Sequence, residues 1–131
     1  MSESNPKPNF GEDSAINAVS LCTSKCVPCE GGIPKLDRVQ ATQWCRATPS
    51  WTLSSDANRI SRTMKCKNFA EALTHLNQIA ALAETEQHHP DLHLTGYRNL
   101  GIELTTHAID GLSMNDFVLA AKIDQALDAG G

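Results

Sequence analysis

Helical periodicity is clearest between Asn68 and about Gln87. Apolar residues recur there at intervals of three and four, the spacing of one face of an α-helix. They are Phe69, Leu73, Leu76, Ile79, Ala80 and Ala83. Asn68 can cap the start of this helix, and Glu71, three residues later, gives it a capping-box beginning. Pro90 disfavours helical geometry at the residue before it, so we expect the helix to end near His89.

Two shorter helices are predicted on either side of this long one. In the first, Asp37 is the expected N-cap, and the segment ends at residues 48–50. Its apolar side is expected to contain Val39, Trp44 and Cys45. In the second, Ser113 is the expected N-cap, with Asp116 at capping-box spacing. The apolar stripe that follows holds one polar neighbour, Asp124.

Four extended segments fill the rest of the pattern. Residues 51–54 and 59–65 are predicted to form a strand pair around a turn, and residues 93–97 and 99–106 a second pair. Leu100, Ile102 and Leu104 alternate with less apolar residues, as in a half-buried strand. Arg62 falls on the same face as Ile60 and Met64, so it needs an edge position or a partner.

The order helix, strand, strand, helix, strand, strand, helix predicts an α+β domain. We expect a four-stranded antiparallel sheet with three helices packed on one face. We expect residues 36–128 to form this domain. They are preceded by a polar tail at residues 1–20, predicted to be flexible, and a loop rich in Cys, Gly and Pro at residues 21–35.

The chain has 131 residues, which suits a single domain, and its net charge is −4. This charge argues against a nucleic-acid-binding surface, which is usually basic. No apolar run reaches the roughly 18 residues of a membrane span, and the polar N-terminus does not resemble a secretory signal. We therefore expect a cytoplasmic protein.

Five cysteines, an odd number, argue against a disulfide framework. Cys22, Cys26 and Cys29 could bind zinc as a regulatory module if a fourth ligand came from elsewhere, but no second pair of Cys or His lies nearby. The interpretation that we prefer is a turn-rich segment without chemistry. Cys45 and Cys66 are expected to be small buried residues. His75 is expected to be an exposed residue of the long helix.

Histidines gather where the long helix gives way to a strand. His88 and His89 lie at this junction, and His107 lies at the end of the last predicted strand. Glu84 is one helical turn before His88, and Asp116 is in the first turn of the last helix. Imidazoles beside carboxylates suit proton transfer near neutral pH. Two histidines spaced i and i+4 on one helix, a familiar zinc pattern, are absent here, so we expect no metal at this cluster.

Seven residues recur at fixed spacings across this part of the chain: Glu84, His88, His89, Pro90, Tyr97, His107 and Asp116. This arrangement resembles the motif of the pterin-4a-carbinolamine dehydratases. Trp51 is similar to a Trp that family members carry at the start of their first strand. The resemblance covers about residues 26–128. It implies an α+β fold and assembly into dimers or tetramers.

The resemblance also implies an activity, the dehydration of 4a-hydroxytetrahydrobiopterin to quinonoid dihydrobiopterin during pterin recycling. His88 and His107 would act as acid and base, and His89 would hold the pterin ring. Glu84 and Asp116 would orient the imidazoles, and Pro90 and Tyr97 complete the motif as binding or orienting residues. The pterin is the substrate, and no cofactor or metal is required.

An alternative function comes from the loop at residues 91–96, which resembles that of a bacterial and plant branch of the family. That branch includes non-catalytic proteins that assist RuBisCO assembly. Under this alternative the partner is RuBisCO and the location is the carboxysome. The motif is compatible with both functions, because a protein can keep a histidine site that is suited to catalysis without catalysing the reaction.

Overall fold

The computed structural model describes residues 34–130, with side chains up to residue 128. Along the chain they form α2 (Arg38–Arg46), β1 (Thr52–Leu53), β2 (Ile60–Lys65), α3 (Phe69–Glu86), β3 (Asp91–Thr95), β4 (Asn99–Leu104), the short 3₁₀ helix η1 (His107–Ile109) and α4 (Met114–Gly130). This order confirms the predicted one, with η1 added. The predicted tail, Cys22, Cys26, Cys29 and the loop up to residue 33 lie outside the described residues.

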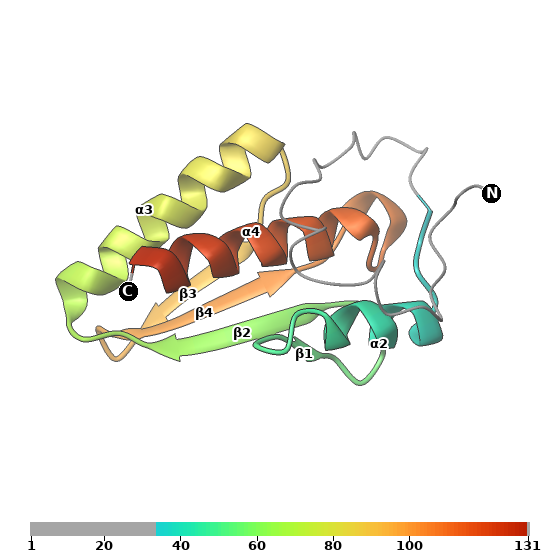
Figure 1. Ribbon diagram of the computed structural model, residues 1–131, viewed down its shortest axis with the longest axis horizontal. Coiled ribbons are helices and arrows are strands. Elements are labelled where there is room, and N and C mark those ends of the chain that lie inside the picture. The colour runs from blue at the N-terminus through green and yellow to red at the C-terminus, as the bar shows by residue number, and fades with distance from the viewer. Residues whose placement is uncertain (1–33, 131) are drawn as a thin grey trace.

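The four strands form one antiparallel sheet in the order β1-β2-β4-β3. Residue Ile102 of β4 pairs with Arg62 on one side and Leu92 on the other, which fixes the register across three strands. The helices α3 and α4 lie against each other across one face of the sheet, and α2 lies beside β1 (Figure 1). The expected α+β architecture, with helices on one side, is confirmed.

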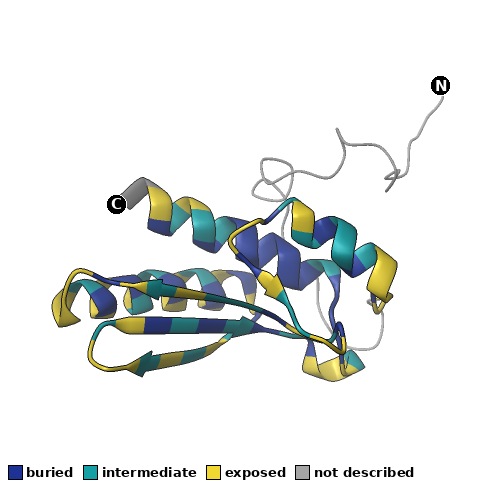
Figure 2. Cartoon of the chain, turned by 90° about the horizontal axis from the view of Figure 1, so that it is seen from below, coloured by how far each residue is buried: buried dark blue, intermediate teal, exposed yellow. Residues whose placement is uncertain are grey.

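Strand alternation decides which face of the sheet meets the helices. Leu100, Ile102 and Leu104 of β4 are fully buried, whereas Gly101 and Glu103 between them are partly exposed. Figure 2 shows this alternation from the side of the sheet. Phe117, Leu119 and Ile123 of α4 complete the core from the other layer. None of the helices among the described residues combines the length and the hydrophobicity needed to cross a membrane.

The helix starts follow the sequence closely. Asp37 caps α2 in a full capping box with Gln40, and the Asn68 side chain accepts a hydrogen bond from the backbone N–H of Glu71 at the start of α3. The prediction for Val39 was wrong. Its side chain is 67% exposed, because it lies on the opposite side of the helix from the buried Trp44.

Arg62 and Asp124 break the apolar pattern of β2 and α4, and they bind each other. The Arg62 guanidinium donates a hydrogen bond to Asp124 and a second one to Asp128, at 3.3 Å. The indole Nε1 of buried Trp51 also donates to Asp124, at 2.9 Å. Burial raises the pKa of the Asp124 carboxyl, and the bonds from Trp51 and Arg62 act against that rise. Arg62 therefore has the partner that its position requires. It also lies just beyond the pairing of β1, which reaches only Ile60 and Ser61 of β2.

The turn between β3 and β4 differs from the prediction. β3 ends at Thr95, and Gly96 and Tyr97 both have positive φ, at 54° and 59°. Two consecutive left-handed residues reverse the chain, which Gly allows without strain and Tyr does not favour. Tyr97 is therefore a turn residue and not the end of a strand. Its ring is 59% exposed and contacts the Arg98 guanidinium.

Candidate active site

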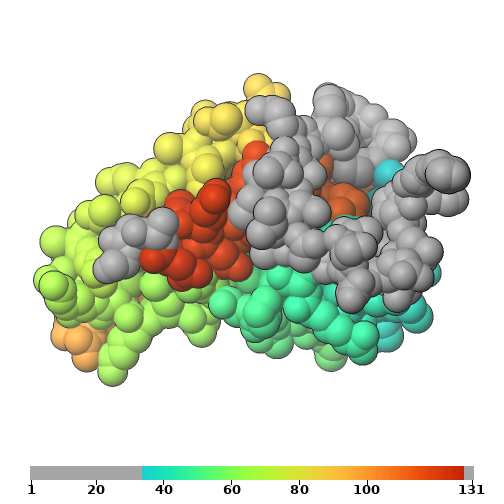
Figure 3. Space-filling model, viewed as in Figure 1, coloured from blue at the N-terminus to red at the C-terminus, as the bar shows by residue number. Residues whose placement is uncertain are grey.

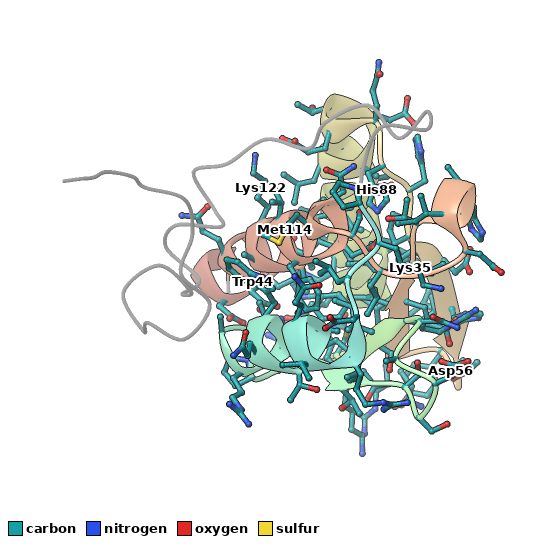
Figure 4. The ribbon with its side chains drawn as sticks, turned by 90° about the vertical axis from the view of Figure 1, so that its right-hand side faces the viewer. Lys35, Trp44, Asp56, His88, Met114 and Lys122 are labelled. Atoms are coloured by element: carbon teal, nitrogen blue, oxygen red, sulfur yellow. The ribbon has the colours of Figure 1, made fainter. Side chains whose placement is uncertain are left out.

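The end of α3 sets the direction of the histidine pair. α3 ends at Glu86, and Gln87 takes the left-handed conformation, with φ 55°, as its C-cap. The Glu86 side chain is buried and accepts a hydrogen bond from the Lys122 ammonium of α4 at 2.7 Å, which fastens the end of α3 to α4. Figure 4 shows Lys122, His88 and Met114 at this end of the two helices. The reversal at Gln87 sends His88 inward and His89 outward.

His88 is buried and bound to a fully buried carboxylate. Its Nε2 lies 2.6 Å from Oδ1 of Asp116, in the first turn of α4. The side chains of His88 and Asp116 are 5% and 0% exposed. An ionised carboxylate only accepts hydrogen bonds, so Nε2 of His88 carries the proton. This bond fixes the orientation and the tautomer of the imidazole.

The other oxygen of Asp116 is held by two donors. Oδ2 accepts from the hydroxyl of Thr106 at 2.8 Å and from the backbone N–H of Ser113 at 3.0 Å. Because Thr106 donates to Asp116, the hydroxyl of Ser113 donates to Thr106, at 2.8 Å. The backbone N–H of Asn115 in turn donates to the Ser113 hydroxyl. The result is a directed chain of hydrogen bonds that ends on the carboxylate facing His88.

His89 forms a second imidazole–carboxylate pair, this time on the surface. Its Nε2 lies 2.7 Å from Oε2 of Glu84, and the two side chains are 61% and 78% exposed. The i and i+4 spacing had suggested that Glu84 faces His88. The structure corrects this, because α3 stops before His88 and the reversal at Gln87 brings His89 back toward Glu84. An exposed pair of this kind contributes about 0–1 kcal/mol to stability, so it orients the ring more than it holds the fold.

His107 reaches the same end of the molecule from the sheet, and we call the end that holds His88, His89 and His107 the histidine rim. Residue Asp91, just after the histidine pair and Pro90, pairs with Glu103 near the end of β4. After β4 the chain passes Thr106, whose side chain binds Asp116, and reaches the exposed His107 at the start of η1. The predicted strand 99–106 ends early, at Leu104, because Thr106 forms only an isolated bridge with Gly111. The structure therefore brings the three histidines to one end of the molecule, between α3, β4 and α4.

Tyr97 is not part of this cluster. It lies in the turn at the opposite end of β4, and six strand residues span about 20 Å. Thr106 and Ser113 complete the site instead. Ser113 was expected only as a helix cap, and Thr106 carried no signal of its own in the sequence. The capping-box spacing of Ser113 and Asp116 was the one hint, because the same geometry that caps α4 also orients the carboxylate.

The arrangement matches a known family. The sequence profile described as pterin 4 alpha carbinolamine dehydratase matches residues 34–126, which is the whole α+β domain up to the last turns of α4. This chain belongs to that family. A Halorhodospira halophila member is 46% identical over 106 residues, which cover 81% of this chain and 96% of the relative. Pterin-4-alpha-carbinolamine dehydratase 2, mitochondrial, from Arabidopsis thaliana is 38% identical over 118 residues, which cover 88% of this chain and 63% of the relative.

A solved structure shows the same fold. The crystal structure of a transcriptional coactivator/pterin dehydratase from Brucella melitensis matches with a TM-score of 0.65 and 27% identity, and covers 70% of this chain and 96% of that one. A pterin dehydratase-like protein described as a RuBisCO assembly factor in the α-carboxysome matches with a TM-score of 0.49 and 21% identity, over 57% of this chain and 86% of that one. These values are too low for the second likeness to carry an argument about function.

Proposed function

We propose that this member of the pterin 4 alpha carbinolamine dehydratase family catalyses the dehydration of 4a-hydroxytetrahydrobiopterin to quinonoid dihydrobiopterin. The observation that carries the proposal is the buried bond between His88 and Asp116. The Asp116 carboxylate is fully buried and accepts three hydrogen bonds, one of them from an imidazole. Burying a charge costs free energy, and an apolar residue would pack there without that cost. It suits an imidazole that must gain and lose a proton.

The reaction asks only for two proton transfers. The bond between C4a and the hydroxyl oxygen breaks as that oxygen takes a proton and leaves as water. N5 loses its proton, and the electrons of the N–H bond form the double bond between N5 and C4a. No electrons leave the pterin, so the chemistry needs an acid and a base and no redox cofactor. A well-placed acid or base contributes about 10²–10⁴ in rate.

The geometry suggests how the three histidines share this work. We assign the acid and base roles to His88 and His107. Nε2 of His88 is held by Asp116, which keeps the ring in one orientation for proton transfer. The negative charge of Asp116 stabilises the imidazolium that forms when His88 takes a proton. His89, oriented by Glu84 on the exposed side of the rim, is placed to hold the pterin ring.

The main alternative is a protein that keeps the fold to assist RuBisCO assembly, with a carboxysomal location. The intact hydrogen-bond chain from Asn115 to Asp116 favours the enzyme, because a surface for protein binding makes no use of a buried, oriented imidazole. The cytoplasm is the location that we propose for the enzyme.

Self-association is also proposed for this protein. Phe69 and Leu73, one turn apart on α3, are 50% and 40% exposed, which is unusual for large apolar side chains. Figure 3 shows the surface of α3 beside that of α4, open to view along much of its length. Such an apolar helix face suits a homodimer or homotetramer contact, and light scattering on the purified chain measures the assembly.

The test of the proposed activity is a stopped-flow measurement of 4a-carbinolamine dehydration by the purified full chain. We expect a rate far above the uncatalysed reaction. A background rate from folded protein would overturn the proposal. In that case co-expression with RuBisCO decides whether the alternative applies, since an assembly factor increases the yield of soluble RuBisCO.

A further inference from the structure

A second cluster of chemically capable side chains lies at the other end of α3. Cys66 follows β2 directly, and Glu71 and His75 lie one turn apart on α3. One ligand atom from each of the three lies within 4.8 Å of the other two. Cys66 and His75 are buried, at 2% and 7% exposure, and Glu71 is partly exposed. His75 was expected on the helix surface, and its burial beside a thiol is the feature that needs an explanation.

We propose that Cys66, Glu71 and His75 bind a zinc ion. Thiolate sulfur, imidazole nitrogen and carboxylate oxygen are the three ligand types that zinc takes from proteins. Bonds of 2.0–2.3 Å in tetrahedral geometry place ligand atoms about 3.3–3.8 Å apart. The observed spread of no more than 4.8 Å therefore has to close by at most about 1–1.5 Å, within the reach of side-chain rotation. Glu71 borders the solvent, which leaves room for water as the fourth ligand.

The neighbours of His75 prepare it for this role. Its Nδ1 lies 3.0 Å from Oε1 of Gln78, and a carbonyl oxygen only accepts, so Nδ1 carries the proton. The other ring nitrogen, Nε2, then has the lone pair that a metal requires. A hydrogen bond from the far side of the ring to a fixed acceptor is the usual support of a metal-binding histidine.

Glu71 is also fixed in place before any ion arrives. Its Oε1 accepts a hydrogen bond from the backbone N–H of Lys67 at 2.5 Å, and its own backbone N–H is bound by the cap residue Asn68. These two bonds orient the carboxylate toward the end of β2, where Cys66 lies, and its second oxygen stays available. The bonds at the start of α3 therefore support both the helix and the cluster.

Zinc binding at the cluster should be coupled to loss of the Cys66 proton. Burial raises the pKa of the Cys66 thiol, and the nearby negative charge of Glu71 raises it further. Both effects oppose a thiolate in the absence of a positive charge, and a bound divalent ion reverses them. Zinc binding must therefore release the thiol proton, and the affinity for zinc should increase with pH.

The cluster is separate from the proposed active site. From His75 to the end of α3 at Glu86 the helix axis runs about 17 Å, and His88 lies beyond that end. Zinc at this position would tie the end of β2 to the first turns of α3, so it stabilises the fold and takes no part in the dehydration. Its presence can be tested without any assay of activity.

Cobalt replaces zinc as a visible probe in this test. The full chain is prepared with Cys22, Cys26 and Cys29 changed to Ser, so that thiols outside the described residues do not contribute. We expect one Co²⁺ per chain, with a thiolate-to-cobalt charge-transfer band, strong visible bands of tetrahedral coordination, and displacement by Zn²⁺. Cys66→Ser should abolish the charge-transfer band, and His75→Gln should weaken binding by more than about 100-fold.

Matched variants separate coordination from folding. Cys45→Ser removes a thiol of α2, and His93→Gln removes an exposed histidine of β3, and neither should change cobalt binding. Glu71→Gln keeps an oxygen for the Lys67 N–H and so preserves the cap, but it should weaken cobalt binding as well. If the chain without Cys22, Cys26 and Cys29 gives no thiolate-to-cobalt band, or if Cys66→Ser and Glu71→Gln both keep it, the proposed site does not exist.

Discussion

The imidazole of His88 and the carboxylate of Asp116 lie 28 residues apart in the chain and are joined by a buried hydrogen bond of 2.6 Å. One residue follows the end of α3 and the other belongs to the first turn of α4. The bond therefore links the relative position of two helices to the orientation and tautomer of one ring. The expected effects of substitutions at Asp116 and His88 follow from that link.

Asp116→Asn should damage both stability and catalysis. The carboxylate accepts from His88, Thr106 and the Ser113 N–H, whereas an amide has one oxygen, so its NH₂ group must face at least one of these donors. We expect a loss of about 1–3 kcal/mol in the free energy of unfolding. We also expect about a 10²–10⁴-fold lower dehydration rate, because the tautomer of His88 is no longer fixed.

Urea unfolding and stopped-flow kinetics on the same preparations measure the two effects of Asp116→Asn. Asp91→Asn is the control, since Asp91 is exposed at the start of β3 and should change neither quantity. An Asp116→Asn variant with wild-type rate and stability would show that the carboxylate does not govern the ring.

His88 and His89 are neighbours in sequence but should differ in their effect on stability. His88→Gln removes the partner of a buried carboxylate and should cost about 1–3 kcal/mol in the free energy of unfolding. His89→Gln breaks an exposed pair with Glu84 and should cost no more than about 1 kcal/mol. Urea denaturation of both variants gives the comparison, and equal losses would contradict the buried and exposed placement of the two rings.

Asp124 should leave a signature in the pH dependence of stability. Burial raises the pKa of its carboxyl above the ordinary value of 3.8, so the folded chain holds this proton more tightly than the unfolded chain. Stability therefore falls as pH rises from that value through the raised pKa, and the loss is complete above it. Asp124→Asn lacks this effect.

The measurement for Asp124 is the difference in the free energy of unfolding between wild type and Asp124→Asn, followed from acid to neutral pH. We expect the free energy of unfolding of wild type to fall relative to that of the variant as pH rises. Asp128→Asn, which removes the exposed second partner of Arg62, should not reproduce this trend. A difference that is constant or grows in favour of wild type would contradict the raised pKa.

Tyr97→Ala should leave the dehydration rate unchanged. The ring is exposed in the turn between β3 and β4, and the length of β4 separates it from the histidine rim by about 20 Å. Steady-state kinetics beside wild type measure the effect. A steep loss of rate would contradict this account and would mean that the turn of a second copy reaches into the site.

The sequence predicted the fold well because its signals were local. Asn68 and Asp37 were assigned as helix caps from spacing alone, and both cap helices in the structure. Arg62 and Asp124 were each recognised as misplaced polar residues. Their pairing was beyond prediction, because it depends on how α4 crosses β2, which neither local pattern contains.

The site was less accessible to prediction, since its geometry depends on single backbone reversals. A left-handed Gln87 decides that Glu84 meets His89 and not His88, and no residue type near it signals that conformation. The positive φ of Tyr97 was equally unpredictable from the sequence, because Tyr rarely adopts this conformation. The prediction that His75 is exposed was wrong for a different reason. Helical periodicity cannot show that Cys66 and the end of β2 cover that side of α3.

The most direct test of the central claim is the dehydration rate of a His88→Ala, His107→Ala double variant beside wild type and a His93→Ala control. His93 lies on the exposed side of β3, away from the histidine rim, and its loss should not change the rate. We expect wild type and the control to dehydrate the 4a-carbinolamine rapidly and the double variant to fall toward the uncatalysed rate. A folded double variant that keeps the wild-type rate would contradict the assignment of this rim as the active site.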